Sequence, residues 1–360
     1  MSDFNVVAII GNGFDVSVLN RYRKDGVLST YSKFCDFLIY KNFNEDNIVF
    51  KRMQADKAAG KENWSDFENT IDTMAKEGVN PVSLEKALNE LSESFYSFID
   101  GVANRDVNIE LNRDSRRKEL GKKSLKGFLM DLSEEEYHRI IKVPNLISNY
   151  TKYEISFFNL NYTNLFDNYI HLGKDFDPHP YSTSDNNIWL DLNSKGYCPR
   201  DFATFKDPVV RLVSNQVMHP HGCYNIPDSL IFGTANNKHD RLNKNYWFDN
   251  SQKYTDILNK AQLIVVFGCS LGESDAWWWN HIYTQLKEEK SFLMIYFYNK
   301  SHKKTEDEVR DLFIQRSGNS PDSTEKSKIT ERIAVRLYEN DSDHDFCGLG
   351  VDEGDGVDIL

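Results

Sequence analysis

The segment VVAIIGNGFD at residues 6–15 constrains the fold more than any other part of the sequence. Residues 6–10 are five apolar, mostly β-branched positions typical of a buried strand, and the turn GNG at 11–13 follows at once. A buried strand that passes through glycines into a helix N-terminus is the unit with which α/β sheets bind nucleotide phosphates. Val16 stands where the full dinucleotide fingerprint needs a third glycine, so a plain strand-to-helix turn remains the alternative.

Short apolar segments later in the chain predict further strands. They are bounded by polar residues, Gly or Pro, and several are apolar on both faces, as strands covered by helices on both sides would be. These segments are 154–160, 229–233, 262–268, 292–298 and 333–338. Together with residues 6–10 they predict an α/β fold, Rossmann-like, with a mostly parallel sheet of about six strands.

The stretch from residue 45 to 154 has helical spacing and few β-branched runs. Its clearest helical segments are 64–75, 83–103 and 133–142. The sequence therefore predicts a helical insertion or cap at 45–154. The first strand and helix lie before it at 1–44, the remainder of the Rossmann-like domain follows at 155–338, and an acidic tail that we expect to be flexible occupies 339–360.

Composition excludes several classes of protein. The 360 residues carry a formal net charge of −12, and residues 339–360 contribute eight acidic side chains with neither Lys nor Arg. The remainder is only mildly acidic, which makes nucleic acid an unlikely partner. Five cysteines without a CxxC pair argue against a disulfide framework and a zinc ribbon, and we expect no metal. No apolar run reaches the roughly 18–20 residues of a membrane span, and the N-terminus lacks a signal-peptide pattern, so we expect a cytoplasmic protein without a membrane partner.

Small and polar residues follow four of the predicted strands, where ligands bind in open α/β sheets. These loops are GNG (11–13), NYTN (161–164), GTANN (233–237) and GCSLGESD (268–275), and a further motif, HPHG (219–222), lies just ahead of the predicted strand 229–233. Asn161 and Thr163 in the loop NYTN can hydrogen-bond a ribose, an amide or a water, although a turn that caps the next helix is an equal alternative. His221 in HPHG can act as a general base near neutral pH, or it is an ordinary loop histidine. Ser270 and Asp275 in GCSLGESD are candidate contacts to a bound nucleotide.

The ordered set of motifs resembles the abortive-infection AbiH family, whose members are bacterial anti-phage proteins. The motifs that carry the resemblance are IIGNGFD, STYSKF (29–34), WSDFE (64–68), NLNYTNLFD (159–167), HPHG with IFGT (219–234) and VFGCSLGESD (266–275). The resemblance extends to about residue 300. The family usually has histidine before the serine of the last motif, and this chain has Cys269.

AbiH proteins in turn resemble the sirtuin-like NAD-binding fold, and this likeness implies roles for individual residues. Asn161 would align with the catalytic asparagine and His221 with the catalytic histidine. The zinc-binding cysteine pairs of deacetylating sirtuins are absent, so the resemblance does not extend to deacetylation. The residues that would contact NAD are Gly11, Asn12, Gly13, Asp15, Thr163, Gly268, Ser270 and Asp275.

The leading hypothesis is an anti-phage effector that binds NAD as its substrate and cleaves the nicotinamide–ribose bond. The alternative is a non-catalytic nucleotide sensor or scaffold that engages a phage or partner protein. In either case we expect a small-molecule nucleotide as ligand, a homo-oligomer, and a phage-derived trigger or a companion defence protein.

Overall fold

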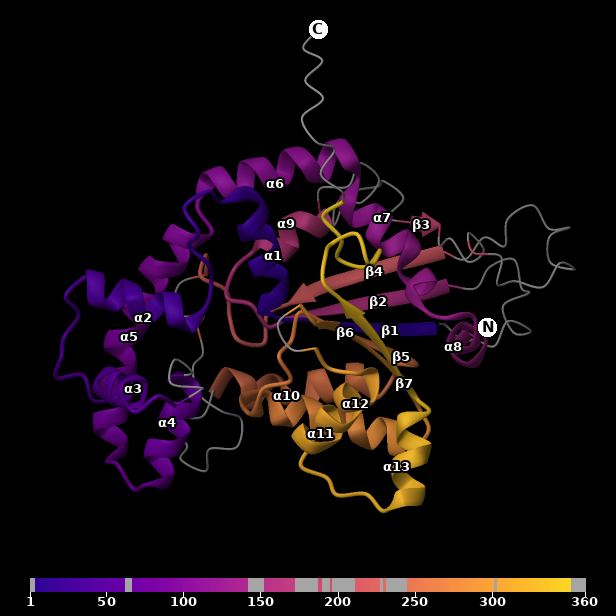
Figure 1. Cartoon of the computed structure of the whole chain (residues 1–360). Coiled ribbons are helices and arrows are strands. Elements are labelled where there is room, and N and C mark those ends of the chain that lie inside the picture. Colours follow the sequence, from indigo (N-terminus) through magenta and orange to yellow (C-terminus); the bar gives the residue numbers. More distant parts are fainter. Residues whose placement is uncertain are drawn as a thin grey trace, which may run out of the picture.

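The computed structural model describes residues 4–61, 67–141, 152–171, 187–189, 195, 211–226, 229–230, 245–300 and 303–350. Within these segments seven strands form one sheet (Figure 1): β1 (Phe4–Ile10), β2 (Lys152–Asn159), β3 (Asn187–Trp189), β4 (Arg211–Met218), β5 (Leu263–Phe267), β6 (Phe292–Tyr298) and β7 (Ile333–Tyr338). Their order is β3-β4-β2-β1-β5-β6-β7. Six of these strands run parallel, and β3 pairs antiparallel with β4 at the edge. The predicted Rossmann-like α/β fold with a mostly parallel sheet is confirmed.

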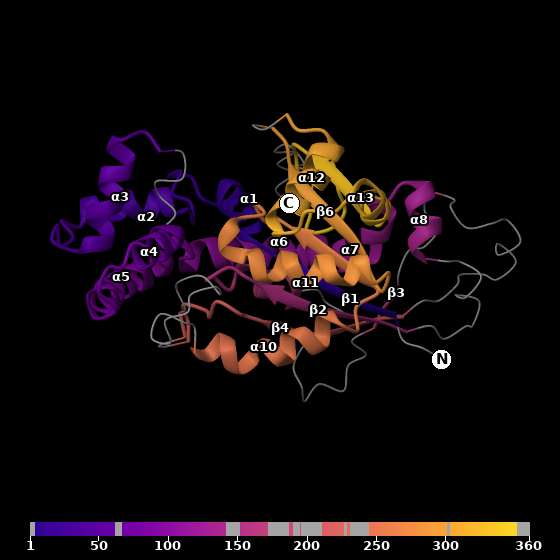
Figure 2. The same cartoon turned by 90° about the horizontal axis from the view of Figure 1, so that it is seen from below.

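Helices cover both faces of the sheet (Figures 1 and 2). One face carries α1 (Asn12–Tyr22), α6 (Arg105–Lys118), α7 (Leu120–Gly127) and α9 (Leu165–His171). The other carries α10 (Asn245–Leu258), α11 (Ala276–Lys287), α12 (Glu306–Arg316) and α13 (Ser323–Thr330). Side chains alternate between the faces because successive residues of a strand point to opposite sides. Thus Val6 and Ala8 join the core beneath α1, whereas Val7 and Ile9 join the core beneath α10 and α11.

The remaining helices come from the segment between the first helix and β2. They are α2 (Tyr31–Tyr40), α3 (Ile48–Ala58), α4 (Phe67–Lys76), α5 (Pro81–Val102), the short η1 (Phe128–Asp131) and α8 (Glu134–Ile141). Helices α2 to α5 lie beyond the carboxyl ends of the strands (Figures 1 and 2). Phe95 of α5 packs edge-to-face on Tyr162, which follows β2, with ring centroids 5.0 Å apart. The helical segment therefore contacts the loops at the carboxyl edge of the sheet.

Asparagine side chains cap the N-termini of α3, α5 and α6. Asn47, Asn80 and Asn104 each accept a hydrogen bond from a backbone N–H of the first turn, which satisfies donors that the helix itself leaves unpaired. Pro81 adds a preset backbone angle at the first position of α5. The helices predicted at 83–103 and 133–142 are confirmed as α5 and α8. Most of the one predicted at 64–75 is α4, and residues 62–66 lie outside the described residues.

The prediction of a strand at 229–233 is wrong for its first two residues. Ser229 and Leu230 belong to no strand, and residues 231–233 lie outside the described residues. The strand beside β2 is instead β4 at 211–218. Consequently the HPHG motif directly follows a strand, at the carboxyl edge, rather than preceding one.

The order in which successive strands are added to the sheet reverses at β1. Strands β2 and β4 follow on one side of β1, and β5, β6 and β7 follow on the other. β1 and β5 are paired in register from Val6–Leu263 to Ile10–Phe267. Ligands of open α/β sheets bind outside the carboxyl ends of the two strands at such a switch point, so the fold directs attention to the loops after Ile10 and Phe267.

The first part of the acidic tail, residues 339–350, packs onto the sheet. The Phe346 ring lies 6.0 Å from that of Phe267 and 5.6 Å from that of Tyr296. The Cys347 amide donates to Ser124 Oγ at 2.8 Å, and Arg21 donates to the Gly350 carbonyl at 2.6 Å. Residues 351–360 lie outside the described residues.

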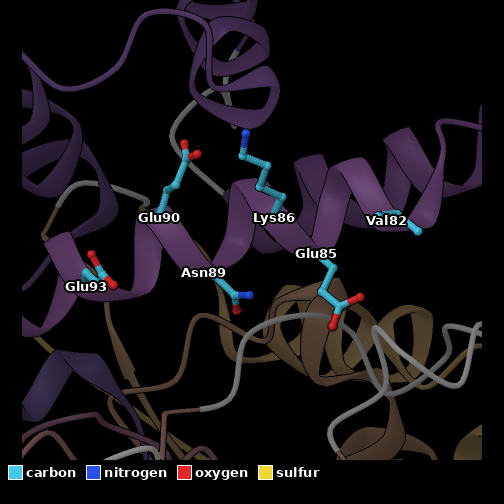
Figure 3. A pocket seen from close by; sticks show the side chains of 6 residues that line it. All are labelled: Val82, Glu85, Lys86, Asn89, Glu90 and Glu93. Atoms are coloured by element: carbon cyan, nitrogen blue, oxygen red, sulfur yellow. The ribbon is translucent and has the colours of Figure 1, made fainter.

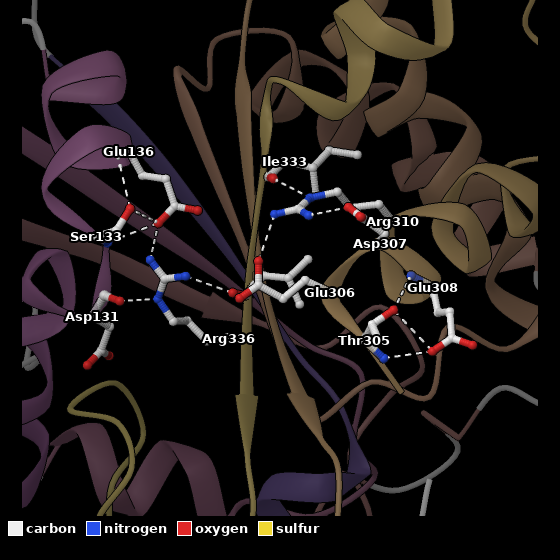
Figure 4. A network of polar contacts seen from close by, with 11 residues as sticks. Asp131, Ser133, Glu136, Thr305, Glu306, Asp307, Glu308, Arg310, Ile333 and Arg336 are labelled. Carbon is white, nitrogen blue, oxygen red and sulfur yellow. Dashed lines mark hydrogen bonds and ion pairs between the residues drawn. The ribbon is translucent and has the colours of Figure 1, made fainter. Parts of the chain in front are cut away.

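An ion pair joins β7 to α8 (Figure 4). The Arg336 guanidinium donates to Glu136 and to the Asp131 carbonyl, and Glu136 also accepts from the Ser133 amide and hydroxyl at the start of α8. Both side chains are largely buried, with 19% and 10% exposed. Burial alone would raise the pKa of Glu136, but the bonds from Arg336 and Ser133 outweigh it and hold the pKa below its ordinary value.

We expect Arg336→Met to lower the free energy of unfolding by about 3 kcal/mol, because it leaves the buried Glu136 carboxylate without its cationic partner. The contribution of the pair is present above the ordinary pKa of glutamate and is lost as the pH falls through the depressed folded value. Urea denaturation at pH 7 measures the change. The double variant Glu136→Gln/Arg336→Met keeps the contact with the start of α8 without the charge, so it should recover most of the loss. Equal instability of the single and double variants would contradict this explanation.

Candidate functional site

Four loops meet at the carboxyl edge of the sheet beside the switch point. They follow β1, β2, β4 and β5, and backbone hydrogen bonds tie them together. The Leu160 amide donates to the Ile10 carbonyl at 2.9 Å, and the Tyr224 amide donates to the Tyr162 carbonyl at 2.8 Å. The convergence that the sequence predicted is therefore present for the loops after β1, β2 and β5, whereas the loop after β4 was not among the predicted ones.

The glycines after β1 allow close contact with the loop after β5. The Gly11 amide donates to the Phe267 carbonyl and the Gly13 amide to the Gly268 carbonyl, both at 2.8 Å. A Cβ added at Gly13 would lie 2.6 Å from the Gly268 Cα, and Gly268 itself has a φ of +69°. Two amides of the GNG turn are thus already bonded to protein carbonyls, and the Asn12 amide lies between them at the start of α1.

Asp15 links the loops after β1 and β2 through two buried hydrogen bonds. Its Oδ1 accepts from Asn161 Nδ2 at 3.0 Å and its Oδ2 accepts from Thr163 Oγ1 at 2.7 Å. Burial raises the pKa of Asp15 to about 7 against the lowering effect of these two bonds, and the charge of Asp167 adds to the rise whereas His219 opposes it. A carboxyl with such a pKa changes its charge in the neutral range.

A second polar group lies beside Asp15. His219 Nε2 is 2.9 Å from Asp167 Oδ1, and Asn159 Nδ2 donates to Asp167 Oδ2 at 3.1 Å. Burial acts to lower the pKa of His219, but the hydrogen bond and charge of Asp167 outweigh it and the pKa is raised. The histidine therefore holds its proton to a higher pH than an isolated imidazole would.

His221 and Asp275 bring the loops after β4 and β5 together. His221 Nε2 lies 3.7 Å from Asp275 Oδ1, with 11% and 22% of the two side chains exposed. Gly222 allows the chain to turn here, because it has a φ of +82° and a Cβ would lie 1.9 Å from the Ser229 carbonyl oxygen. A partly accessible histidine next to a carboxylate is suited to accepting a proton.

The Asn161 side chain keeps one free acceptor. Its Nδ2 donates to the Gly11 carbonyl at 3.1 Å and to Asp15 at 3.0 Å, which uses both amide protons. Within the described segments no group donates to Asn161 Oδ1, yet this oxygen is not among the fully buried polar atoms without a partner. The oxygen therefore reaches solvent on the side away from Asp15.

Comparison with known proteins shows the family to which the chain belongs. A family model described as bacteriophage abortive infection AbiH matches residues 7–297. The chain belongs to the AbiH family. The match includes every loop of the candidate site, and the family description gives the protein a role in abortive infection by phage. No curated protein matches the chain.

The structure assigns different surroundings to the remaining predicted residues of this AbiH protein. Asn12 is exposed, and its amide and carbonyl bond Ser29. Ser270 is exposed after β5. Cys269 lies against Gly11, and burial raises the pKa of its thiol well above the ordinary value. Of the four loops identified from the sequence, the one at 233–237 lies outside the described residues.

Sequence reasoning missed Asp167 and its pairing with His219. A signal was present, because the first turns of α1 and α9 both contain Phe-Asp. The rings of Phe14 and Phe166 pack edge-to-face 5.3 Å apart, and the two carboxyl groups that follow them interact electrostatically. Repetition of this dipeptide after two strand-end turns could have identified the pair.

Other features of the described residues do not extend this site. A pocket lies along one face of α5 (Figure 3), and its lining comes entirely from that helix: Val82, Glu85, Lys86, Asn89, Glu90 and Glu93. Among the described residues, no cluster of three or more His, Cys, Asp or Glu side chains could hold a metal ion. No helix in the described segments combines the length and apolar character needed to cross a bilayer.

Gly13→Ala should destabilise the protein by about 2 kcal/mol, because the new methyl group forces two backbones apart. Gly101→Ala is the matched control: this glycine lies on α5 with nothing within 4 Å of an added Cβ. It should be neutral or stabilising by about 0.5 kcal/mol, since alanine is the better helix former. Urea denaturation compares the two, and equal stability of both variants would argue against the close-contact explanation.

Asp15 should make stability fall as the pH rises. Its folded pKa of about 7 lies above the ordinary value of 3.8, so the native state binds more protons between these values. The free energy of unfolding should therefore decrease by on the order of 4 kcal/mol between about pH 4 and pH 7 and then level off.

Asp15→Asn should remove this part of the pH dependence and fold well at pH 8, because asparagine can accept from Asn161 and donate to Thr163. Denaturation curves from pH 5 to pH 8 test this, with the exposed Asp46→Asn as control. Parallel pH profiles for the wild type and Asp15→Asn would contradict the assignment.

Proposed function

We propose that this AbiH protein binds NAD and hydrolyses its nicotinamide–ribose bond during phage infection. The observation that carries the proposal is the pairing of His221 with Asp275 on loops at the switch point of a Rossmann-like sheet, where the Asn161 loop also lies. This is where such sheets bind nucleotides. The general base and the hydrogen-bond acceptor lie on the loops after two different strands, β4 and β2.

In the proposed reaction the bond between the ribose C1′ and the nicotinamide nitrogen breaks. The bonding electrons leave with neutral nicotinamide, and the transition state resembles an oxocarbenium ion. A water oxygen forms the new bond to C1′, and His221 accepts the proton that the water loses. Asn161 Oδ1 accepts a hydrogen bond from a ribose hydroxyl or from the attacking water. The products are nicotinamide and ADP-ribose.

The contacts available to the NAD phosphates differ from those that the sirtuin resemblance implies. The Gly11 and Gly13 amides donate to carbonyls after β5, so they do not cradle the pyrophosphate. An anion would instead face the N-terminus of α1 at Asn12, where the helix dipole is favourable. The support for NAD therefore rests on the ribose end of the site.

Mass spectrometry of protein incubated with NAD tests the proposal, with and without lysate from phage-infected cells. We expect nicotinamide and ADP-ribose from the wild type and from His138→Ala, a control at an exposed histidine of α8, and at least 100-fold less from His221→Ala. Circular dichroism checks that both variants fold. Full turnover by His221→Ala would contradict its role. Tight NAD binding without turnover in every condition would favour the nucleotide sensor instead.

A further inference from the structure

We infer that Asp15 is a positioning residue: it holds the Asn161 carboxamide in the one orientation that presents Oδ1, an acceptor, to the substrate. The inference rests on the proposed NAD cleavage and specifies how one of its residues is oriented. Asp15 itself is 1% exposed and acts through Asn161 rather than by touching the substrate.

The orientation follows from the acceptors around Asn161. Gly11 O and Asp15 Oδ1 both accept, at 3.1 and 3.0 Å, so only the nitrogen of the carboxamide can face them. A rotated amide would bring its oxygen against two other oxygens and leave buried acceptors without donors, which is costly. The acceptor is therefore turned away from Gly11 and Asp15 by these two contacts.

The Asp15 carboxyl group is itself fixed. Thr163 Oγ1 donates to its Oδ2 at 2.7 Å, and the same hydroxyl oxygen accepts from the Leu165 amide at 3.3 Å at the start of α9. Because Oδ2 is held by Thr163, Oδ1 stays directed at Asn161. This series of hydrogen bonds thus links the start of α9 to the orientation of the Asn161 carboxamide.

This arrangement depends on the ionised form of Asp15. A protonated carboxyl can donate to a rotated Asn161 amide, so the Gly11 carbonyl alone then favours the observed orientation, whereas the carboxylate adds a second acceptor that enforces it. The charged and titratable groups that face Asp15 are Asp167 on α9 and His219 and Cys223 after β4. Activity should therefore rise as Asp15 ionises.

Asp15→Asn tests the inference without removing the packing. Asparagine offers either an oxygen or an amide to Asn161, so only the Gly11 carbonyl still favours the observed orientation of the Asn161 carboxamide. We expect kcat for NAD cleavage to fall about 100-fold with KM nearly unchanged, since orientation matters at the reacting bond. The rise of the pH–rate profile near neutral pH should also become less steep, because the contribution of Asp15 is lost while His221 remains the general base. Asp46→Asn, at an exposed carboxylate, should leave kcat, KM and the profile unchanged.

A second measurement needs no NAD. In protein labelled with ¹⁵N-asparagine, the Asn161 side-chain amide signals are those lost in Asn161→Ser. In the wild type their shifts should titrate with a midpoint near 7, and in Asp15→Asn this titration should vanish. Titration in a protein that does not cleave NAD would support the positioning role and overturn the proposed function. Cleavage by Asp15→Asn at the wild-type rate, or Asn161 signals that do not respond to Asp15, would overturn the positioning role alone.

Discussion

The backbone contact between the GNG turn and Gly268 determines the geometry of the candidate site. It brings the ends of β1 and β5 within hydrogen-bonding distance at the switch point, where only glycine leaves enough room. Helix α1 starts from this contact, so its first turn directs Asp15 toward the loop after β2. The positions of Asn161 and Thr163 then follow from the two oxygens of that carboxyl group.

Burying two carboxyl groups side by side would be costly without compensation. Asp167 is compensated by His219 and Asn159, whereas Asp15 receives only neutral donors and bears a raised pKa. This unequal treatment separates two similar residues into a partner of histidine and a group whose raised pKa makes it respond to pH. The arrangement stabilises the loop positions while it keeps one titratable group behind the crevice.

Local patterns in the sequence were enough to predict several helices and strands. The apolar run before the GNG turn indicated β1, and the spacing of apolar residues indicated α5 and α8. β4 was missed because Ser214, Asn215 and Gln216 interrupt its apolar character, and the more apolar residues 229–233 were chosen instead. The sequence could not show whether Gly11 and Gly13 lie close to a ligand or to Gly268, because either close contact requires glycine. The partnership of Asp15 with Asn161 joins residues 146 positions apart, which no local pattern reports.

The topology also determines when the site can exist. Both neighbours of β1 are synthesised long after it: β2 at 152–159 and β5 at 263–267. Such distant pairings form slowly because long loops must close first. A nascent chain that has exposed β1 therefore has neither Asn161 nor His221 in place, and the crevice is complete only after Asp275 has emerged from the ribosome. Under the proposed cleavage of NAD, this order of assembly would withhold the complete site from every unfinished chain.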